Sequence, residues 1–573
     1  MRSLLSFACI LLGLFQTATA SDGLEQIPVG PIIVQRYAPL ASLRLQQKTL
    51  KQVGPRGTFG FDFSEQSYFD RLKLSKAIAA VDVNSPSYVL SLCDISIGLL
   101  KKPAYLIHCH DQAKLERDLI DGEILTRSTT KGVTELVTAK SAWYIRNRNG
   151  WIFYTRHRQW LRLLTQAKQT SLDEALLPRT KRAARASHAS LIFSIGHLGQ
   201  AHRRFWARVK GLFPRDDGRR SEFPTAKPAN EVMGEKFVAG MKGALRDVVE
   251  RCEKDVTWGI ATVNCDVSGM EFRVLVDVEP RSPTSKLLSH LKPGVSDRAI
   301  EGLPDGGAVY VEYDGVPRLY ARVAEWAKSF SVHRILTKSL DGFAAQVLNA
   351  KCKSIATVVM RERDGEQARF ITKAECVRPK NLQLACRSID RLIWKNALSP
   401  QSTLSVWKDY ETFMNSPVDI VYRRFRSRQM RRGLTHDFLI GSLFNQAFGQ
   451  VCRIRQTSIG KTFIRASGTR AQFERAVTRD HETLAKANPE FLATLQKLDS
   501  PANITLLIDL CKVAPGLVKI AGKKFKPQNT SSFCGISIGT SDAGIEMQLV
   551  VTEKQIRDIS DGALATLMRS FKK

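Results

Sequence analysis

Ser537 is the residue that best matches a known catalytic pattern, because residues 535–539 read G-x-S-x-G. Hydrolases with this pattern place the serine on a sharp turn between a strand and a helix, where an acid and a histidine activate its hydroxyl. Here the flanking residues alternate as in two successive strands, and the last histidine, His481, lies upstream. The pattern therefore predicts a strand of a hairpin, with an envelope hydrolase using Ser537 as the alternative.

His108 and His110 form the segment most similar to a metal site, His-Cys-His-Asp at 108–111. On a strand, side chains two residues apart share a face, so both imidazoles could reach one ion. A third ligand is not identifiable, and the matching segment of the second half, 370–376, contains no histidine. We therefore predict an ordinary polar strand end, with no metal and no other cofactor, and keep a metal site at these two histidines as the alternative.

Two arginine-rich segments carry the strongest remaining signal, and each places cations beside aromatic residues. Guanidinium groups bind phosphate, sulfate and carboxylate through paired hydrogen bonds, and aromatic rings stack on sugars and bases. The alternative is a solvated cationic face, or side chains whose aliphatic stems cover apolar surface. The predicted anion-binding residues are Arg203, Arg204, Arg208, Arg423, Arg424, Arg426, Arg428, Arg431 and Arg432.

The whole chain is basic: its 573 residues include 86 Lys and Arg against 55 Asp and Glu, a formal net charge of +31 at pH 7. Such an excess favours anionic partners and says nothing about the fold. With 43% hydrophobic and 25% charged residues, the composition is that of a globular protein and excludes disordered, collagen-like and multi-spanning membrane proteins. The length predicts more than one domain.

The first twenty residues have the features of an export signal. Arg2 is followed by the apolar stretch 4–15 and by the small-x-small sequence at 18–20. This stretch is too short to span the roughly 30 Å of hydrocarbon in a bilayer. We expect Met1–Ala20 to be removed, which leaves a formal charge of +30, and we predict a periplasmic or extracellular protein with no transmembrane segment.

Ten cysteines remain outside the signal, and none forms a C-x-x-C pattern. Several stand in apolar or alternating segments, as Cys93 and Cys534 do, where a thiol behaves as a small hydrophobic group. A domain of this size does not need disulfides for its stability. We predict mostly buried thiols, and any disulfide pairing stays open.

Two pairs of landmarks indicate a tandem duplication. Segments 27–37 and 303–313 share a Pro, a Gly and a final Tyr, and the alternating hairpins 259–276 and 535–551 share their glycines. The members of both pairs begin 276 residues apart. An internal repeat of this length indicates two copies of one domain rather than a solenoid.

Inside the copies the spacing changes, which places extra residues in different parts of each copy. Phe153 pairs with Phe463, 310 residues further on, and Ala189 pairs with Ala502, 313 residues further on. We therefore predict a first repeat at 21–300 with a basic insertion near 196–258. The second repeat is predicted at 301–573 with a basic insertion near 389–449.

Short alternating segments joined by tight turns, with amphipathic helices between them, favour an α+β fold. We predict two tandem copies, each a mostly antiparallel sheet covered by helices, and loops at 168–188 and 211–230. In the first copy the predicted strands are 32–37, 88–93, 104–109, 133–139, 142–146, 151–155, 191–195, 259–267 and 270–278, and the predicted helices are 65–79, 112–120, 157–167 and 233–252.

The layout resembles that of uncharacterised exported bacterial proteins built from a duplicated α+β module. In those proteins a Pro-x-Gly opening, an alternating strand and a Tyr recur, and a strand–Gly–strand hairpin closes each copy. The likeness is carried here by 27–37, 303–313, 259–276 and 535–551. It covers nearly the whole chain after the signal, and it implies the duplicated fold but no activity and no functional residues.

We therefore predict an exported binding or structural protein of the cell envelope without catalytic activity. It is expected to engage anionic polymer or lipid surfaces through its Arg-rich insertions, since concentrated basicity is carried separately by each copy. Intracellular nucleic acid is not an expected partner of an exported protein.

Overall fold

The computed structural model describes the chain from residue 22 to residue 556, with gaps. The described residues are 22–29, 32–43, 72, 80–92, 103–119, 124–160, 170–194, 254–266, 268–291, 293, 298–314, 342–343, 345–360, 370–396, 402–425, 451–478, 484–499, 501–510, 512–513, 532–541 and 543–556. The predicted signal and nearly all of the predicted insertion at 196–258 lie outside them.

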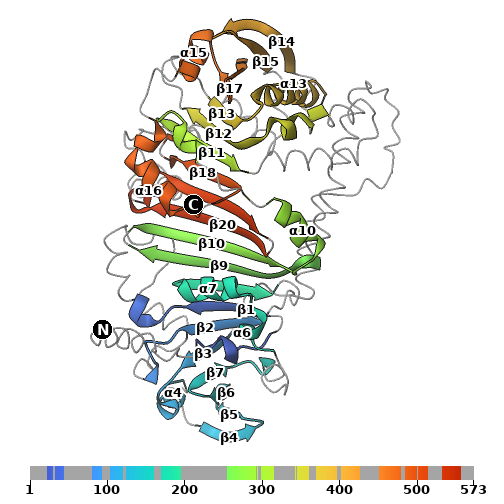
Figure 1. Cartoon of the computed structure of the whole chain (residues 1–573). Helices are drawn as coiled ribbons and strands as arrows, with labels where there is room; N and C mark the ends of the chain where they lie inside the picture. Colours follow the sequence, from blue (N-terminus) through green and yellow to red (C-terminus); the bar gives the residue numbers. More distant parts are fainter. Residues whose placement is uncertain are drawn as a thin grey trace, which may run out of the picture. The chain divides into compact units, whose positions relative to one another are not determined.

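The chain divides into two compact units. In the first unit, ten strands pair in the antiparallel order β10-β9-β8-β1-β2-β3-β7-β6-β5-β4 (Figure 1). Their bounds are β1 Ile32–Tyr37, β2 Ser87–Leu92, β3 Pro103–His108, β4 Ile124–Thr130, β5 Val133–Thr138, β6 Ala142–Arg148, β7 Trp151–Thr155, β8 Ala189–Ser194, β9 Val256–Asp266 and β10 Gly269–Val278. The helices described here are η1 Leu24–Gln26, α4 Gln112–Leu119, α6 Leu172–Ala175 and α7 Pro178–Ala186.

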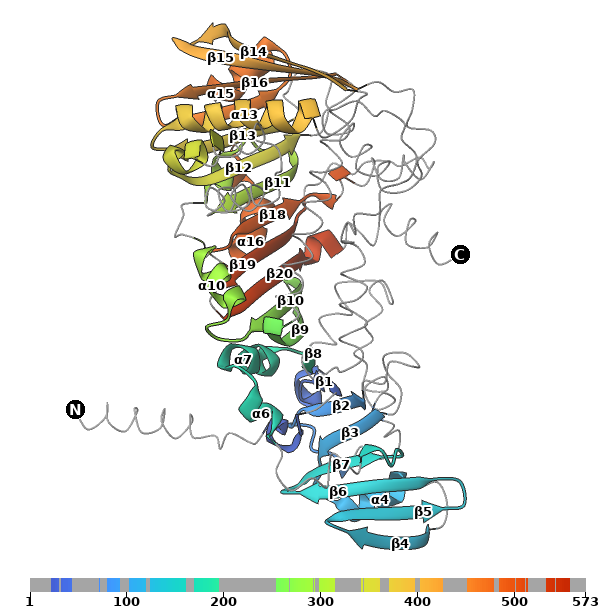
Figure 2. The ribbon, with the colours of Figure 1, turned by 90° about the vertical axis from the view of Figure 1, so that its right-hand side faces the viewer.

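In the second unit, ten strands pair in the antiparallel order β20-β19-β18-β11-β12-β13-β17-β16-β15-β14. Their bounds are β11 Gly307–Asp314, β12 Cys352–Met360, β13 Phe370–Cys376, β14 Ser402–Phe413, β15 Ser416–Phe425, β16 Val451–Ile459, β17 Thr462–Ser467, β18 Ile504–Ile508, β19 Cys534–Ser541 and β20 Gly544–Thr552. The helices described here are α10 Pro283–His290, η3 Ala299–Gly302, α13 Pro379–Asn396, α15 Arg470–Thr478, η5 Ala485–Ala487 and α16 Pro489–Lys497. Figure 2 shows α13 lying against the sheet of this unit.

The two units repeat one strand order, so that β1 to β10 correspond in turn to β11 to β20. In both, the third strand pairs with the seventh, β3 with β7 and β13 with β17, although three other strands lie between them in the sequence. The landmarks of the sequence fall on equivalent elements: β1 and β11 for the first pair, and the hairpins β9–β10 and β19–β20 for the second. The boundaries of the repeats stay a prediction.

The predicted fold class is wrong. The twenty described strands form a single antiparallel sheet with few helices, not two separate sheets covered by helices. The alternation of apolar and polar residues indicates which face of a strand is buried, but not which strand lies beside it. The sequence pattern therefore does not distinguish one continuous sheet from two.

Among the described elements of the first unit, two differ from the prediction. The predicted helix 112–120 is confirmed as α4, whereas the predicted helices 65–79, 157–167 and 233–252 and the predicted loop 211–230 lie wholly or largely outside the described residues. The predicted strands are confirmed with small shifts at their ends, but β4 was not predicted, because all seven of its residues are exposed and it has no buried face. Residues 168–188, predicted as a loop, contain α6 and α7. Helix α7 buries only Thr180 and Ala184, so its sequence lacks the apolar periodicity that predicts a helix.

Large aromatic side chains fill the core of each unit. In the first unit Tyr88 and Trp151 are buried, with ring centroids 6.1 Å apart. In the second unit the rings of Tyr310, Phe491 and Phe533 contact one another edge to face. Since the units have separate aromatic cores, each can be described by itself.

The prediction of mostly buried thiols is wrong for one pair, because Cys352 and Cys376 form a disulfide. They stand opposite each other where β12 begins and β13 ends, a pairing that a sequence separation of 24 residues does not reveal. Of the free cysteines described, Cys109, Cys265 and Cys534 are buried. Burial raises the pKa of the Cys265 thiol to about 12, which keeps it protonated and unreactive.

Cys109 occupies the position in the first unit that Cys376 occupies in the second. Its backbone forms an isolated antiparallel β-bridge with Val81. Two hydrogen bonds flank this pair, from Asp82 N to His108 O and from His110 N to Ala80 O, both 3.0 Å. These bonds make Val81 and Cys109 a non-hydrogen-bonded pair, in which the side chains of facing residues approach most closely. Val81 thus stands where the second unit has Cys352.

We predict that Val81→Cys creates a second disulfide, because the new thiol lies opposite Cys109 in this close pair. Air-oxidised protein, unfolded and treated with maleimide, should show one fewer reactive thiol than the wild type by mass spectrometry. After full reduction of both proteins, the variant should show one more than the wild type. Val81→Cys combined with Cys109→Ser is the control and should leave the new thiol free. A new thiol that stays free in the single variant would contradict the equivalence of the two positions.

Candidate functional site

The predicted anion-binding arginines lie largely beyond the part of the chain that the structure describes. Only Arg423 and Arg424 fall on a described element, β15, where their backbones pair with Leu404 and Thr403 of β14. Strand β15 corresponds to β5 of the first unit. These two arginines therefore stand on a strand that both units share and not on an added segment.

Ser537 lies within β19, between β18 and β20, in agreement with the predicted hairpin strand. Its side chain is 3% exposed, and its hydroxyl donates a hydrogen bond of 3.3 Å to Gln548 Oε1. An amide oxygen is too weak a base to activate a serine. The geometry described around Ser537 does not favour the hydrolase alternative, which stays an untested prediction.

His108 and His110 share a face, as predicted, but both turn toward one carboxylate. Asp82 Oδ2 lies 3.0 Å from His108 Nδ1, and Asp82 Oδ1 lies 3.7 Å from His110 Nε2. Burial raises the pKa of Asp82, but hydrogen bonds from Ser85, the Asn84 N–H and His108 outweigh this effect and hold that pKa below its usual value. Within the described ranges, no group of three or more His, Cys, Asp or Glu side chains could hold a metal ion.

The equivalent place in the second unit carries five exposed cations, which we call the cationic corner. It comprises Lys351, Lys353, Arg378, Lys380 and Lys461. Backbone hydrogen bonds bring their segments together: Val377 N donates to Lys351 O at 3.4 Å, Arg378 N to Ala350 O at 3.1 Å, and Cys376 N to Lys461 O at 2.8 Å. The disulfide between Cys352 and Cys376 joins the same segments covalently.

Almost nothing on the described part of the chain neutralises this charge. No ion pair or side-chain hydrogen bond between described residues involves any of the five cations, and Glu375 is the one carboxylate in these segments. Helix α13 begins here at Pro379, so its free N–H groups add positive potential. The cationic corner can therefore attract phosphate, sulfate or carboxylate groups.

The same corner of the fold has opposite chemistry in the two units. Both are closed by equivalent backbone bonds, since Cys109 N donates to Gly150 O at 2.9 Å as Cys376 N does to Lys461 O. The equivalent pairs are Ala80 and Lys351, Asp82 and Lys353, His108 and Glu375, His110 and Val377, Asp111 and Arg378, and Gly150 and Lys461. The shared fold does not require cations at this corner, so their gathering in one unit needs another explanation.

Helix α7 is a second basic surface, but its charge is mostly paired. A hollow of about 550 Å³ is lined by Pro178, Lys181, Arg182, Arg185 and Ala186. Arg185 pairs with Asp22 at 2.5 Å and with Asp173 at 3.0 Å, and Lys181 pairs with Asp173 at 3.2 Å. Because two carboxylates already neutralise most of this face, the cationic corner is the stronger candidate for binding an anion.

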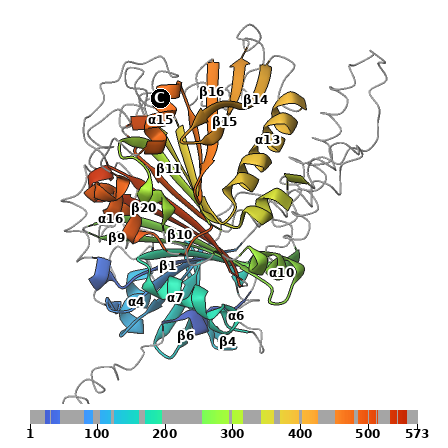
Figure 3. The ribbon, with the colours of Figure 1, turned by 45° about the horizontal axis from the view of Figure 1, so that its top comes forward.

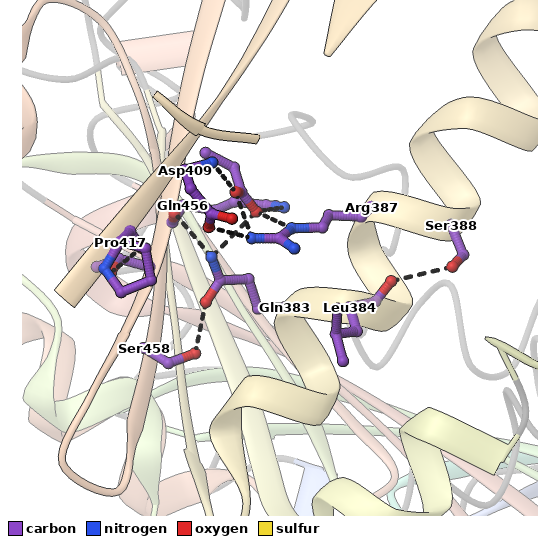
Figure 4. A network of polar contacts seen from close by, with 10 residues as sticks. Gln383, Leu384, Arg387, Ser388, Asp409, Pro417, Gln456 and Ser458 are labelled. Carbon is purple, nitrogen blue, oxygen red and sulfur yellow. Dashed lines mark hydrogen bonds and ion pairs between the residues drawn. The ribbon is translucent and has the colours of Figure 1, made fainter. Parts of the chain in front are cut away.

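A buried carboxylate, Asp419, anchors α13 on β14, β15 and β16, which run side by side along this helix in Figure 3. Asp419 is fully buried and forms an ion pair with Arg387, whose Nη2 lies 2.5 Å from Asp419 Oδ1. Gln383 and Gln456 donate to Asp419 Oδ2 at 3.0 and 3.3 Å (Figure 4). Ser458 in turn donates to Gln383 Oε1 at 3.0 Å.

Asp419 also organises a bulge in β14. Three residues of β14, 408–410, stand opposite Asp419, and Asp409 has a φ of 46°. This conformation directs Asp409 N to Asp419 Oδ1 at 3.1 Å and lets the Asp409 carboxylate accept from Arg387 Nη2 at 2.9 Å. Both oxygens of Asp419 are thus saturated with donors, so this network stabilises the fold and offers no free base for catalysis.

The first unit has a polar anchor at the corresponding place. Glu116 on α4 is 5% exposed, accepts from Gln112 Nε2 at 2.7 Å and pairs with Arg127 on β4 at 3.3 Å. Asn147 on β6 donates to Gln112 Oε1 at 2.6 Å, at the position that Ser458 occupies in the second unit. The two units therefore hold their helices through similar contacts between different residues.

Comparison of this chain with protein-family models, with curated proteins and with solved structures finds no match. Among the residues that the structure describes, no helix is long and apolar enough to cross a membrane.

We predict that Asp419→Asn destabilises the second unit by about 3–5 kcal/mol at pH 7, because it removes the buried member of the ion pair with Arg387 and leaves this arginine only the exposed carboxylate of Asp409. Burial raises the pKa of Asp419, but Arg387, Gln383, the Asp409 N–H and Gln456 together lower it below the usual value. The carboxylate therefore stabilises the fold above the unfolded pKa of about 4, and this stability is lost as the pH falls through the lower folded pKa.

Thermal unfolding measured by circular dichroism between pH 2 and pH 7 tests this prediction. The difference in melting temperature between wild type and Asp419→Asn should be largest at neutral pH and should decrease in acid. Asp409→Asn is the matched control, since this carboxylate contacts the same arginine but is 58% exposed, and it should cost at most about 1 kcal/mol. Equal effects of the two substitutions would show that burial of Asp419 does not matter.

Proposed function

We propose that this protein is an exported, non-catalytic binding or structural component of the cell envelope that engages an anionic polymer or lipid surface. The observation that carries the proposal is the cationic corner, where five exposed cations gather around one disulfide without an ion-pair partner among the described residues. Like charges repel, so such a cluster costs free energy unless an anion offsets the repulsion.

The net charge of the chain supports the same proposal. A formal charge of +31 is spread over the whole sequence, and the Arg-rich segments, including Arg423 and Arg424 on β15, add to it. The disulfide between Cys352 and Cys376 supports export, because disulfides persist in oxidising compartments and are rare in the cytosol.

Replacing the five cations of the corner by glutamine is expected to weaken binding to dextran sulfate, a soluble polyanion. In the wild type the logarithm of the affinity should fall linearly with the logarithm of the salt concentration. In the variant the slope should be reduced by about one for each cation that contacts the polymer. Fluorescence anisotropy of labelled dextran sulfate at several salt concentrations measures both quantities.

The matched control removes five exposed lysines from other places: Lys131, Lys140, Lys286, Lys408 and Lys486. It changes the net charge of the protein by the same amount, so it should reduce the affinity much less than the corner variant. Equal losses in the two variants would show that only total charge matters. Wild-type binding that does not depend on salt would refute the electrostatic proposal altogether.

A further inference from the structure

Two apolar side chains protrude among the cations of the corner. Val377 is 64% exposed and stands directly between Cys376 and Arg378. Leu384 is 38% exposed and follows Lys380 by one turn on α13. Exposed apolar side chains therefore stand beside exposed cations in the segments that form the cationic corner.

The position of Val377 is fixed by its neighbours. Its N–H donates to Lys351 O, and the residues on either side of it are held by Cys352 and Ala350. Beneath the corner lies a small apolar cluster of Ala350, Ala374, Cys376, Leu382 and Phe463. Val377 is excluded from this cluster although it adjoins one of its members, so the fold holds an apolar side chain in water next to five cations.

The partners of the proposed function differ in what they offer such a side chain. A soluble polyanion supplies charge, and cations alone are sufficient to bind it. A bilayer with anionic headgroups supplies charge at its surface and hydrocarbon a few ångströms below. It therefore binds more tightly to a surface that combines Lys and Arg with protruding apolar residues. Of the two partners, only the bilayer also offers apolar contact to the exposed side chains of Val377 and Leu384.

We propose that the cationic corner docks on an anionic lipid bilayer, with Val377 inserted below the headgroups and the five cations paired with lipid phosphates. The proposal rests on the proposed function and narrows it to the lipid. The strand ends, the disulfide and the first turn of α13 form the docking surface, so no change of conformation is required. Contact is peripheral and reversible, since one valine buries little area.

Co-sedimentation with vesicles tests the proposal, using mixed phosphatidylglycerol and phosphatidylcholine vesicles beside vesicles of phosphatidylcholine alone. We expect wild-type protein to bind the anionic vesicles and not the neutral ones. The five-glutamine variant of the corner should bind the anionic vesicles at least about a hundredfold more weakly, because each cation near an anionic surface contributes to the affinity.

Substitutions of Val377 separate the lipid from the soluble polymer. Val377→Ser should weaken vesicle binding roughly threefold, and Val377→Leu should strengthen it roughly threefold, in proportion to the apolar area available for insertion. Neither should change the affinity for dextran sulfate. Leu125→Ser is the matched control, because Leu125 is 61% exposed on β4 and lies outside the corner, and it should leave both affinities unchanged.

The outcomes distinguish this inference from the function on which it rests. Docking on a lipid bilayer is refuted if dextran sulfate binds with salt dependence but anionic vesicles do not bind. It is also refuted if Val377→Ser and Val377→Leu leave vesicle binding unchanged. In both cases the proposal that the protein binds an anionic partner is retained. If neither probe binds, both proposals fail. Because Val377→Leu is expected to increase the affinity for anionic vesicles, the proposal can still be tested if the serine variant fails to fold.

Discussion

The pairing of the third strand with the seventh is the constraint on which the rest of the second unit depends. Because β13 pairs with β17, the end of β13 meets the turn before β17, and Cys376 N bonds to Lys461 O. Lys351 reaches the same place because β12 pairs with β13. Five like charges repel one another, so the corner must be held by forces that do not depend on their charge. Backbone hydrogen bonds, a disulfide and the apolar cluster around Phe463 supply them.

The buried anchor at Asp419 also helps to hold the corner in place, because it fixes α13 on the sheet. Gln383 and Arg387 fix the second and third turns of the helix on the sheet, so the first turn, which carries Lys380, has a defined place. A buried ion pair adds little net stability compared with apolar packing, but it penalises any shift that leaves one charge alone. The anchor therefore specifies where the helix lies more than it stabilises the fold.

Much of the local structure could be predicted from the sequence, and the corner could not. The sequences of the strands Ile32–Tyr37 and Trp151–Thr155 show either an alternation of apolar and polar residues or a short apolar run, and both patterns predict strands. The offset of 276 residues relates the hairpin β9–β10 to the hairpin β19–β20. Lys351, Arg378 and Lys461 are single charges far apart in the sequence, so no run of basic residues reveals them. A run of charge in the sequence contains only neighbours in the chain, while the pairing of β13 with β17 brings together residues that are not neighbours.

The strand order that the two units share explains how one of them carries a charged corner without loss of the fold. In the first unit the corner is closed by the same backbone bonds but holds Asp82 with His108 and His110, and Val81 stands opposite Cys109. The closure thus depends on the backbone and tolerates very different side chains, because the anchors, Glu116 on α4 and Asp419 on β15, do not belong to the corner. Function resides in such substitutable positions rather than in the fold itself. A cation cluster that the fold does not need, reinforced by a disulfide at the place where the first unit has Val81 opposite Cys109, is therefore best explained by what it binds.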